Sequence, residues 1–241
     1  MRYGLFGDIH GNLEAFEAVL EDLRRQGIDR LFSLGDIVGY GPDPNSCVEV
    51  IRKLSIPSVS GNHDWASVGR SDLDYFNPRA KEAILWTKKV LTEENKAYLK
   101  RLPLIIEGNN FQLVHGSLKK PADWFYILNF QEAENIFALM EKPLLFAGHS
   151  HVPIVFCKTE GKISCISDSR LNLKEEAKYI INAGSVGQPR DGDSRSSYVI
   201  FDEGKREIIY KRVKYPIAKV QRKIRKAGLP EIEAARLSAG R

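Results

Sequence analysis

The 241-residue sequence predicts an α/β protein, a two-sheet αββα sandwich of mixed parallel and antiparallel sheets with flanking helices. Short apolar runs alternate with amphipathic segments over the first 60 residues, and this rhythm is typical of parallel βαβ units. Between residues 154 and 210, strand-like runs follow one another with little helix between them, which indicates antiparallel pairing. We expect a single domain over residues 1–241, with a helical appendage from about residue 215 to residue 241.

The first 60 residues predict three strands separated by two helices. Asn12 is a good N-cap for the first helix, whose apolar residues recur every three or four positions. Gly27 suits the position after this helix, because glycine adopts left-handed backbone angles freely. The predicted strands are residues 3–6, 31–34 and 56–60, and the second helix is predicted over residues 44–54.

The middle of the chain predicts more helix and one hairpin. Pro78 is a good first residue for one helix, and Thr92, followed by two glutamates, begins a second one that ends near residue 101. Gly108-Asn109-Asn110 separates two apolar runs and is a hairpin signal. The strands predicted here are residues 104–106, 111–114 and 144–147, and a further helix is predicted over residues 130–140.

The last third predicts mostly strands joined by tight turns. Glycine-containing turns at residues 159–162 and 202–205 indicate hairpins. The polar residues 168–177 are expected to form a surface loop. The predicted strands are residues 154–157, 163–166, 179–181, 198–201 and 208–210.

The C-terminal segment is helical and basic. Pro216 and Gly228 bracket an amphipathic helix, and a last short helix begins near Pro230. From Lys205 to Arg241, twelve Lys or Arg stand against three Glu, a net charge of +9, so the preceding 204 residues carry −4 of the total +5. We interpret the basic residues as a solvated helix face. The alternative, contact with nucleic acid, is not favoured.

The composition argues against a membrane-spanning helix and against a disulfide framework. No run approaches the ~20 apolar residues that a spanning helix needs. Cys47, Cys157 and Cys165 are scattered and odd in number, which favours free thiols in a reducing cytosol. The N-terminal residues run directly into a polar motif and leave no room for a signal peptide. We therefore expect a cytoplasmic protein.

All five histidines lie in short motifs beside Gly, Asp or Asn, and most of these motifs follow an apolar run. Imidazole is the commonest metal ligand and titrates nearest neutral pH, so histidines gathered in this way indicate a site. Each motif alone has an ordinary explanation as a turn, a helix cap or a satisfied core histidine. Five motifs in series favour one common site. They are Gly7-Asp8-Ile9-His10, Gly35-Asp36-Ile37-Val38-Gly39, Gly61-Asn62-His63-Asp64, His115-Gly116 and Gly148-His149-Ser150-His151.

The polar motifs follow predicted strands, and the carboxyl ends of such strands line one edge of an α/β sheet, where ligands bind. The side chains there offer carboxylate, amide and imidazole donors but no thiolate, which suits Mn, Fe, Zn or Co better than Ca or a structural zinc. The number of these donors is larger than the number of ligands that a protein usually supplies to one ion. Two ions about 3.5–4 Å apart, bridged by one carboxylate, would use all of them. The predicted ligands are Asp8, His10, Asp36, Asn62, His115, His149 and His151.

The series DxH, GDxVxxG, GNHD, HG and GHSH resembles the calcineurin-like metallophosphoesterase superfamily, in its small single-domain, phosphodiesterase-like branch. The resemblance runs from Asp8 to His151. The stretch from Asn182 to Arg190 is also similar to that branch. Together these segments span most of residues 1–200. The five motifs occur in the same order as in the family pattern.

The resemblance implies a role for each motif residue. His63 would face the substrate as a proton donor or charge stabiliser, and Asp64 would fix its orientation. The implied cofactor is a pair of divalent transition metal ions, manganese first, with Fe, Zn, Co or Ni as alternatives. The two implied ligand groups, which share Asp36 as a bridge, are Asp8, His10 and His151 for one ion and Asn62, His115 and His149 for the other.

The predicted activity is hydrolysis of phosphate mono- or diesters in a small phosphorylated substrate. A water shared by two cations loses a proton near neutral pH, and the resulting bridging hydroxide is the nucleophile. The metals also take up charge from the phosphoryl oxygens. A positioned acid such as His63 typically contributes ~10²–10⁴-fold to the rate.

Residues outside the motifs bear on the substrate less directly. Tyr40 follows the bridging motif and is a candidate pocket residue, although the same stretch also reads as an ordinary turn. Arg190 is a candidate phosphate contact, because a guanidinium matches that anion with paired donors, and the alternative is a surface arginine. Residues 124–126, a Trp-Phe-Tyr segment preceded by Lys119 and Lys120, could stack on a nucleobase, but we interpret the segment as core.

Three alternatives stay open at this point. The first is hydrolysis of the phosphoanhydride of a dinucleoside polyphosphate, indicated only by residues 124–126 and the lysines before them. The second is a protein-binding scaffold of the same fold with a degraded metal site, against which the retention of His63 argues. The third is a nucleic-acid binder or nuclease that uses the basic C-terminal residues. The physiological substrate, the native metal and the oligomeric state are not predicted.

Overall fold

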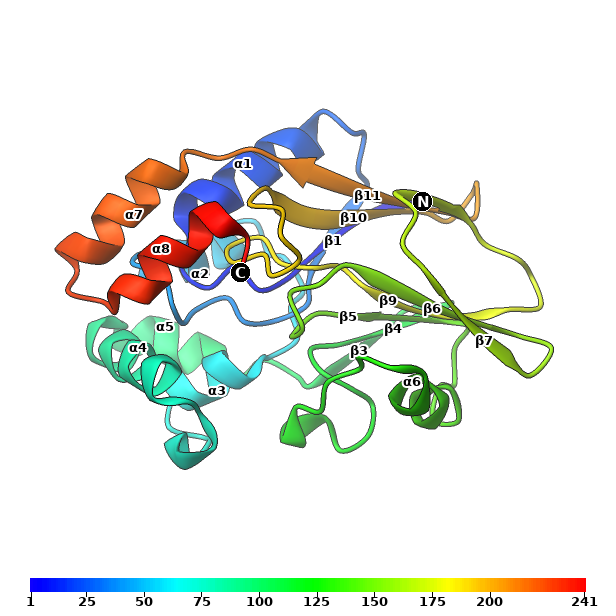
Figure 1. The fold of residues 1–241 in the computed structure, drawn as a ribbon, viewed down its shortest axis with the longest axis horizontal. Helices are drawn as coiled ribbons and strands as arrows, with labels where there is room; N and C mark the ends of the chain where they lie inside the picture. The colour runs from blue at the N-terminus through cyan, green and yellow to red at the C-terminus, as the bar shows by residue number, and fades with distance from the viewer.

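Two β-sheets pack face to face and helices cover their outer sides, which confirms the predicted αββα sandwich. The computed structural model describes residues 1–241. Most helices gather toward one end of the sandwich, and the strands extend from there to the other end (Figure 1).

One sheet has five strands and joins the beginning of the chain to residues near its end. Its N-terminal pair is parallel, with Tyr3 opposite Arg30, and the other pairs are antiparallel. In spatial order the strands are β2 (Arg30–Ser33), β1 (Arg2–Phe6), β10 (Ser196–Asp202), β11 (Glu207–Val213) and β8 (Arg170–Asn172).

The other sheet has six strands, all from the middle of the chain. The pairs β4–β5 and β5–β9 are parallel, and the outer pairs are antiparallel, including the predicted hairpin around Gly108. In spatial order the strands are β3 (Ile105–Glu107), β4 (Phe111–Val114), β5 (Leu144–Ala147), β9 (Lys178–Asn182), β6 (Ile154–Thr159) and β7 (Lys162–Ile166).

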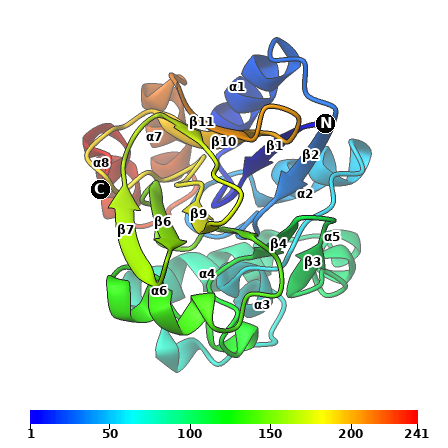
Figure 2. The same ribbon diagram turned by 90° about the vertical axis from the view of Figure 1, so that its right-hand side faces the viewer.

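Helices lie outside both sheets, as Figures 1 and 2 show. One helix, α6 (Phe130–Phe137), packs on the outer face of the six-stranded sheet. Single turns of 3₁₀ helix occur at Leu73–Tyr75 and Pro121–Asp123. The other helices are α1 (Leu13–Arg24), α2 (Pro44–Lys53), α3 (Asn62–Ser67), α4 (Pro78–Val90), α5 (Glu93–Leu99), α7 (Ile217–Lys226) and α8 (Glu231–Ala239).

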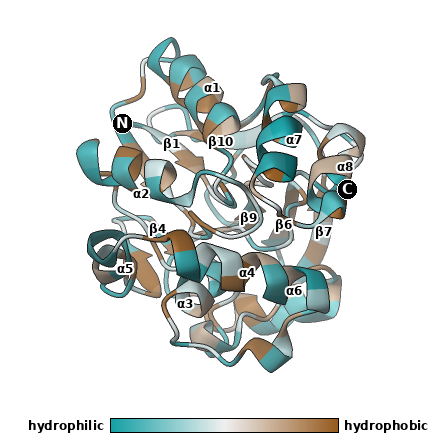
Figure 3. Ribbon diagram, turned by 90° about the vertical axis from the view of Figure 1, so that its left-hand side faces the viewer, coloured by the Kyte–Doolittle hydropathy of each residue, from teal (hydrophilic) through white to brown (hydrophobic).

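The strand period of two divides the apolar residues between two cores. Tyr3 and Leu5 of β1 face the other sheet, where they join Phe146 and Phe201 in a buried inter-sheet cluster. Phe6, on the opposite face of β1, packs with the helices of the outer layer. Figure 3 shows the complementary pattern on the outer helices, where α7 is largely hydrophilic on its outward side. Burial on both faces thus fixes the strand that leads into the first polar motif.

Two predicted elements differ in the structure. Residues 56–60 do not form a strand, since only Ser58 makes a bridge, to Ser33. Pro57 has no N–H to extend the ladder, and the chain turns at Gly61 into α3, a helix that the sequence did not predict. Within the predicted loop 168–177 the chain forms β8, a short edge strand against β11.

No helix of the structure is both long and apolar enough to cross a bilayer.

Candidate metal centre

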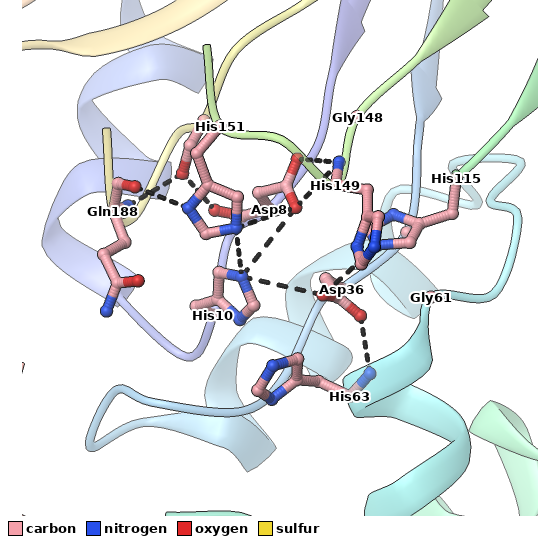
Figure 4. A network of polar contacts seen from close by, with 12 residues as sticks. Asp8, His10, Asp36, Gly61, His63, His115, Gly148, His149, His151 and Gln188 are labelled. Atoms are coloured by element: carbon pink, nitrogen blue, oxygen red, sulfur yellow. Dashed lines mark hydrogen bonds and ion pairs between the residues drawn. The ribbon is translucent and has the colours of Figure 1, made fainter. Parts of the chain in front are cut away.

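The predicted ligands meet at one end of the sandwich, where strands of both sheets end (Figure 4). Asp8 and Asp36 follow β1 and β2 of the five-stranded sheet. His115 and His149 follow β4 and β5 of the six-stranded sheet, and Asn62 is the first residue of α3. All of these side chains are buried. Each strand pair is parallel, so its polar motifs leave the sheet at the same edge, as expected for a ligand site.

Three residues form a first group of potential ligands, Asp8, His10 and His151. His151 Nε2 lies 3.2 Å from Asp8 Oδ1, and His10 Nε2 lies 3.8 Å from the same oxygen. His10 Nε2 and His151 Nε2 are 3.0 Å apart. The donor atoms of this group therefore face a common point.

The second group contains Asp36, His115 and His149, whose donor atoms lie within 4.8 Å of one another. Asn62 belongs with them, because its Oδ1 lies 3.2 Å from His115 Nε2. Asp36 Oδ2 is 3.3 Å from His115 Nε2 and 3.6 Å from His10 Nε2 of the first group. The Asp36 carboxylate thus stands between the two groups, where a shared ligand is expected.

The backbone at five of these residues is left-handed. The φ angles of Asp8, His10, Asp36, His149 and His151 lie between 50° and 68°. This conformation costs an L-residue about 1–2 kcal/mol. Such strain persists only where the surrounding structure enforces it, and it is concentrated at functional sites.

Two glycines of the motifs allow the loops to approach one another. A Cβ atom at Gly61 would lie 2.1 Å from Asp36 Oδ1. A Cβ atom at Gly39, where φ is 122°, would lie 2.7 Å from His63 Nδ1. Any side chain at these positions would displace the Asp36 carboxylate or the His63 ring.

Backbone carbonyls orient three of the histidine rings. His115 Nδ1 lies 2.8 Å from the Leu34 carbonyl, and His151 Nδ1 lies 2.6 Å from the Gln188 carbonyl. His10 Nδ1 contacts the Val38 carbonyl at 3.2 Å. A ring whose Nδ1–H donates to a carbonyl presents its Nε2 lone pair to the cluster, the tautomer that metal ligation requires.

The protonation states of the clustered side chains are also compatible with bound cations. Burial holds the pKa of His10 and of His149 well below the usual range, so both rings are neutral near pH 7. Burial of His115 opposes protonation of its ring. The negative charge of Asp36 and the hydrogen bond between Asp36 and His115 outweigh the effect of burial and raise the pKa of His115 to about 9. No lysine or arginine stands among these donors, and no cysteine joins them. Buried carboxylate, amide and imidazole groups that converge in this way fit divalent transition metal ions.

His63 lies beside the cluster, in the wall of a pocket. Its ring centroid is 4.8 Å from that of His10 and 4.5 Å from that of Tyr40. Its backbone N–H donates to Asp36 Oδ1 at 2.8 Å, while its buried Nδ1 has no hydrogen-bond partner. Burial lowers the pKa of His63 to about 4, although Asp36 opposes the shift. The ring therefore has hydrogen-bonding capacity that the protein itself does not use.

The expectation that Asp64 orients the His63 ring is wrong. Asp64 Oδ1 accepts hydrogen bonds from the backbone N–H groups of Ile37 and Val38, at 2.9 and 3.1 Å. Its other oxygen accepts from the Gly61 N–H at 3.0 Å. Asp64 sits in the first turn of α3, so its carboxylate reaches the neighbouring loop and not the side chain one position before it. It ties the Asp36 loop to the start of α3.

A pocket of about 770 Å³ opens over the cluster. Tyr40 and Arg190, the two candidate substrate contacts, both line it together with His63. The Arg190 guanidinium lies 5.7 Å from the centre of the Tyr40 ring, and its Nη2 donates to Gln188 Oε1 at 2.7 Å. Both residues are thus in position to meet a ligand.

The aromatic segment Trp124-Phe125-Tyr126 also lines this pocket, so its interpretation as core is wrong. Phe125 and Tyr126 remain 45% and 44% exposed. The Tyr126 ring stacks on that of His149, with 3.9 Å between centroids. The segment avoids the core because Trp124 takes a left-handed backbone (φ 56°) directly after a 3₁₀ turn. Trp65, Tyr75 and Phe76, which no sequence motif indicated, extend the aromatic lining.

Half of the twelve basic residues from Lys205 to Arg241 form ion pairs within the molecule. Lys219 and Lys223 of α7 form ion pairs with Glu14 of α1, and Lys223 also pairs with Asp43. Arg225 pairs with Glu231 at the start of α8. These contacts favour the interpretation as a helix face over a free cationic surface.

A two-sheet sandwich with buried carboxylate and imidazole donors beneath an open pocket defines the class of metal-dependent phosphoesterases. The family model described as the calcineurin-like phosphoesterase superfamily domain matches residues 1–206, and the chain belongs to this superfamily. The resemblance stated from the five motifs is thereby confirmed.

Similar proteins agree with this membership. A metallophosphoesterase from Sphaerobacter thermophilus, known as a crystal structure, is 44% identical with a TM-score of 0.87, and the match covers 100% of this chain and 99% of that one. An uncharacterized protein of Methanocaldococcus jannaschii is 47% identical over 241 residues, 98% of this chain and 97% of its own. Phosphodiesterase YfcE of Escherichia coli is 26% identical over 219 residues, 87% of this chain and 91% of its own. The chain is an enzyme of the phosphoesterase class.

Proposed function

We propose that this enzyme hydrolyses phosphate mono- or diesters at a dinuclear metal centre. The observation that carries the proposal is the position of Asp36, whose Oδ2 lies within 3.6 Å of imidazole nitrogens from both donor groups. One carboxylate between two groups of donors is the arrangement that a pair of cations needs. Manganese is the first candidate, and Fe, Zn, Co or Ni are alternatives, because the donors are oxygen and imidazole nitrogen.

The two groups of donors support one set of proposed ligands for each ion. These residues would hold two divalent cations, which would supply the activation of a water near neutral pH and would withdraw charge from the phosphoryl oxygens. The ligand residues, with Asp36 shared, are Asp8, His10 and His151 on one side and Asn62, His115 and His149 on the other.

His63 is the proposed residue that acts on the substrate. In hydrolysis the oxygen of water bonds to phosphorus, the bond from phosphorus to the leaving oxygen breaks, and that oxygen gains a proton. The His63 ring lines the pocket beside His10 and Tyr40, where it can donate a hydrogen bond or a proton to this oxygen. An anionic phosphoryl group close to the ring favours its protonated form. Arg190 and Tyr40 complete the polar wall.

The relationship to phosphodiesterase YfcE supports ester hydrolysis on a small phosphorylated substrate. The two buried cysteines are free, and the third, Cys165, is exposed without a partner, which supports a reducing cytoplasmic location. We treat residues 1–241 as one domain, because α7 and α8 contribute Val220 and Leu237 to the same core as α1.

A second candidate is hydrolysis of the phosphoanhydride of a dinucleoside polyphosphate. The exposed Phe125 and Tyr126 favour it, since aromatic rings at the mouth of a pocket provide faces on which nucleobases stack. The stacked pair of Tyr126 and His149 places this wall next to the metal cluster. A scaffold function without catalysis is less well supported, because the cluster keeps every predicted donor together.

The experiment is a substrate panel on metal-stripped protein with each ion added back singly. Bis-p-nitrophenyl phosphate, p-nitrophenyl phosphate and diadenosine tetraphosphate represent diester, monoester and anhydride. We expect turnover of at least one substrate that depends on an added ion and is abolished again by a chelator. Protein that binds no transition metal, or that turns over none of the three with any ion, contradicts the proposed function.

A further inference from the structure

The C-terminal helix α8 lies beyond the residues matched by the superfamily domain, yet it contributes a side chain to the active-site pocket. Arg236 lines this pocket together with His63, His151 and Arg190. In Figures 1 and 3, α8 lies beside α7, at the end of the sandwich where the helices gather. A segment that lies after residue 206 therefore contributes to the wall of this pocket.

The helix that carries Arg236 is firmly anchored. Ala234 and Leu237 are buried in the helical core, and Gln221 Nε2 of α7 donates to the Ala234 carbonyl at 2.9 Å. After the helix ends, the Gly240 carbonyl accepts from the Gly192 N–H at 2.9 Å. Anchoring at both ends holds the Arg236 backbone in place, as a binding residue requires.

A chain of polar contacts joins Arg236 to the active-site motifs. Arg236 Nη1 lies 3.6 Å from Glu233 Oε2, and Gln188 Nε2 donates to the same oxygen at 2.8 Å. The amide oxygen of Gln188 accepts from Arg190 Nη2 at 2.7 Å. The backbone carbonyl of Gln188 contacts His151 Nδ1. Gln188 thus fixes both arginines relative to a residue of the metal cluster.

The charges around the two arginines are not balanced within the protein. Arg236 pairs with Glu233, and its Nε donates to the main-chain oxygen of Arg241 at 2.5 Å, whereas Glu233 forms no ion pair with Arg190. Arg190 forms no ion pair, and its buried Nε has no hydrogen-bond partner. Burial lowers the pKa of Arg236, and the nearby charge of Arg190 lowers it further. Two arginines that line one pocket, one of them with no ion pair and an unpaired buried Nε, are characteristic of a site for an anion.

We propose that Arg190 and Arg236 form a second anion subsite, which binds a phosphoryl group linked to the one being hydrolysed. This inference rests on the proposed function, because the first phosphoryl group occupies the metal centre. Paired guanidinium groups match phosphoryl oxygens with forked donors. The enzyme then favours substrates with linked phosphoryl groups over simple esters, and Arg236 determines this preference.

The test compares two substrates that share their nucleosides but differ in phosphoryl groups. Adenylyl-(3′→5′)-adenosine has a single phosphodiester, and diadenosine tetraphosphate has linked phosphoryl groups. Arg236→Ala should lower kcat/KM for the tetraphosphate roughly ten- to a hundredfold relative to the diester, mainly through KM, because a charge-assisted hydrogen bond is lost. Arg236→Lys should recover part of the preference for the tetraphosphate, because lysine keeps the positive charge but lacks the paired N–H donors of the guanidinium.

The matched control is Arg222→Ala on α7, which removes one exposed positive charge that makes no ion pair. It should leave the ratio of the two kcat/KM values unchanged. A thermal melt of each variant separates loss of binding from loss of folding. If Arg236→Ala lowers kcat/KM equally for both substrates, the subsite is overturned, because Arg236 then contacts the phosphoryl group that is hydrolysed or stabilises the fold.

A binding measurement keeps this inference separate from the proposed activity. Calorimetric titration of the full-length protein with methylenebisphosphonate and with methylphosphonate, with and without Mn²⁺, should show a preference for the bisphosphonate that Arg236→Ala abolishes. Equal affinities in the wild-type protein contradict the subsite. If no substrate is turned over but the preference is present, the proposed hydrolysis fails while the subsite stands.

Discussion

Asp8, His10, Asp36, His149 and His151 carry the strained backbone that shapes the metal centre. Side chains in a strand alternate between its two faces, so a residue must leave the strand conformation before its side chain can point past the edge of the sheet. A left-handed residue directly after a strand makes this change within one or two positions. Hydrogen bonds that the loops gain offset part of this conformational cost, and we propose that bound cations offset the rest.

His63→Ala is the sharpest single-residue test of catalysis. The ring contacts no donor of the cluster by hydrogen bond, while the backbone N–H that binds Asp36 is kept in the variant. We expect full metal content and a fall in kcat of ~10²–10⁴-fold, as for loss of a positioned acid. Elemental analysis and steady-state kinetics on the best substrate of the panel measure both quantities.

His63→Asn serves as the companion variant, because it retains a short hydrogen-bond donor and should recover part of the lost rate. A His63→Ala enzyme with wild-type kcat would remove His63 from the mechanism. A variant that loses metal as well as activity would instead make the ring a ligand.

Asp36→Asn tests the shared carboxylate. Asp36 Oδ2 faces both His10 and His115, so loss of its charge should weaken both ions together. We expect metal content to fall toward zero per chain at ion concentrations that load the wild-type protein with two. Asn62→Ala is the matched control, because Asn62 touches only His115 of the second group and should cost one ion. Loss of a single ion in Asp36→Asn would contradict the bridging role.

At the scale of elements, the sequence predicted those whose signal is local. α1 shows a capping Asn12, a 3.6-residue apolar period and Gly27 after its end, and the structure has it at Leu13–Arg24. β8 was not predicted because it is a polar edge strand, and only its pairing with β11 makes it a strand. α3 was not predicted because Gly61-Asn62-His63-Asp64 is also a good turn sequence. Its helical form depends on Asp64 reaching the Asp36 loop.

The metal-ligand candidates were predictable because residue type and order reveal them, whereas the pocket walls were not. Phe125 and Tyr126 look like core residues, since large aromatic side chains are usually buried and nothing local marks them as exposed. Arg236 lies 85 residues after His151 in sequence, and only the packing of α8 on the core brings it to the pocket. Contacts of this kind follow from tertiary structure and leave no spacing pattern.

The loop between β9 and β10 provides a prediction at the element scale. Hydrogen bonds from Arg195 and the charge of Arg212 outweigh the opposing effect of burial and lower the pKa of Asp193 from 3.8 to about 2. A carboxyl group whose pKa is lower in the folded state stabilises the fold above about pH 4, and this contribution is lost as the pH falls toward 2. Asp193→Asn should therefore destabilise the protein at pH 7, by no more than about 1 kcal/mol because the group is partly exposed.

Urea unfolding of wild type and Asp193→Asn at pH 7, 4 and 3 measures this effect, and the difference between them should shrink at pH 3. Asp168→Asn is the control, since Asp168 is exposed and forms no ion pair, and it should change stability by less than about 0.5 kcal/mol. An Asp193→Asn deficit that stays constant from pH 7 to pH 3 would show that the pKa of Asp193 is not lowered by folding.

At the scale of the whole molecule, the metal centre joins the two sheets. Asp8 and Asp36 extend from the five-stranded sheet, and His115 and His149 extend from the six-stranded sheet. The sheets also share an apolar core, but at this end the facing groups are polar and buried. Without cations, the buried carboxylates and imidazoles could find hydrogen-bond and charge partners only among themselves. This is unfavourable where two carboxylates or two imidazoles lie close together. We therefore expect the proposed ions to stabilise the fold as well as to serve the chemistry.

Metal addition should consequently raise the melting temperature of the whole protein. A ligand at a hundred times its Kd stabilises the native state by about 2.7 kcal/mol, which for a chain of this size corresponds to a rise of roughly 5–10 °C. Calorimetry of chelator-treated protein with and without Mn²⁺, Fe²⁺, Zn²⁺, Co²⁺ or Ni²⁺ measures it. His63→Ala should keep the shift, because we propose that the ring acts on the substrate and not as a ligand, whereas Asp36→Asn should lose it. A melting temperature indifferent to all five ions would mean that these side chains do not hold the two sheets together through metal.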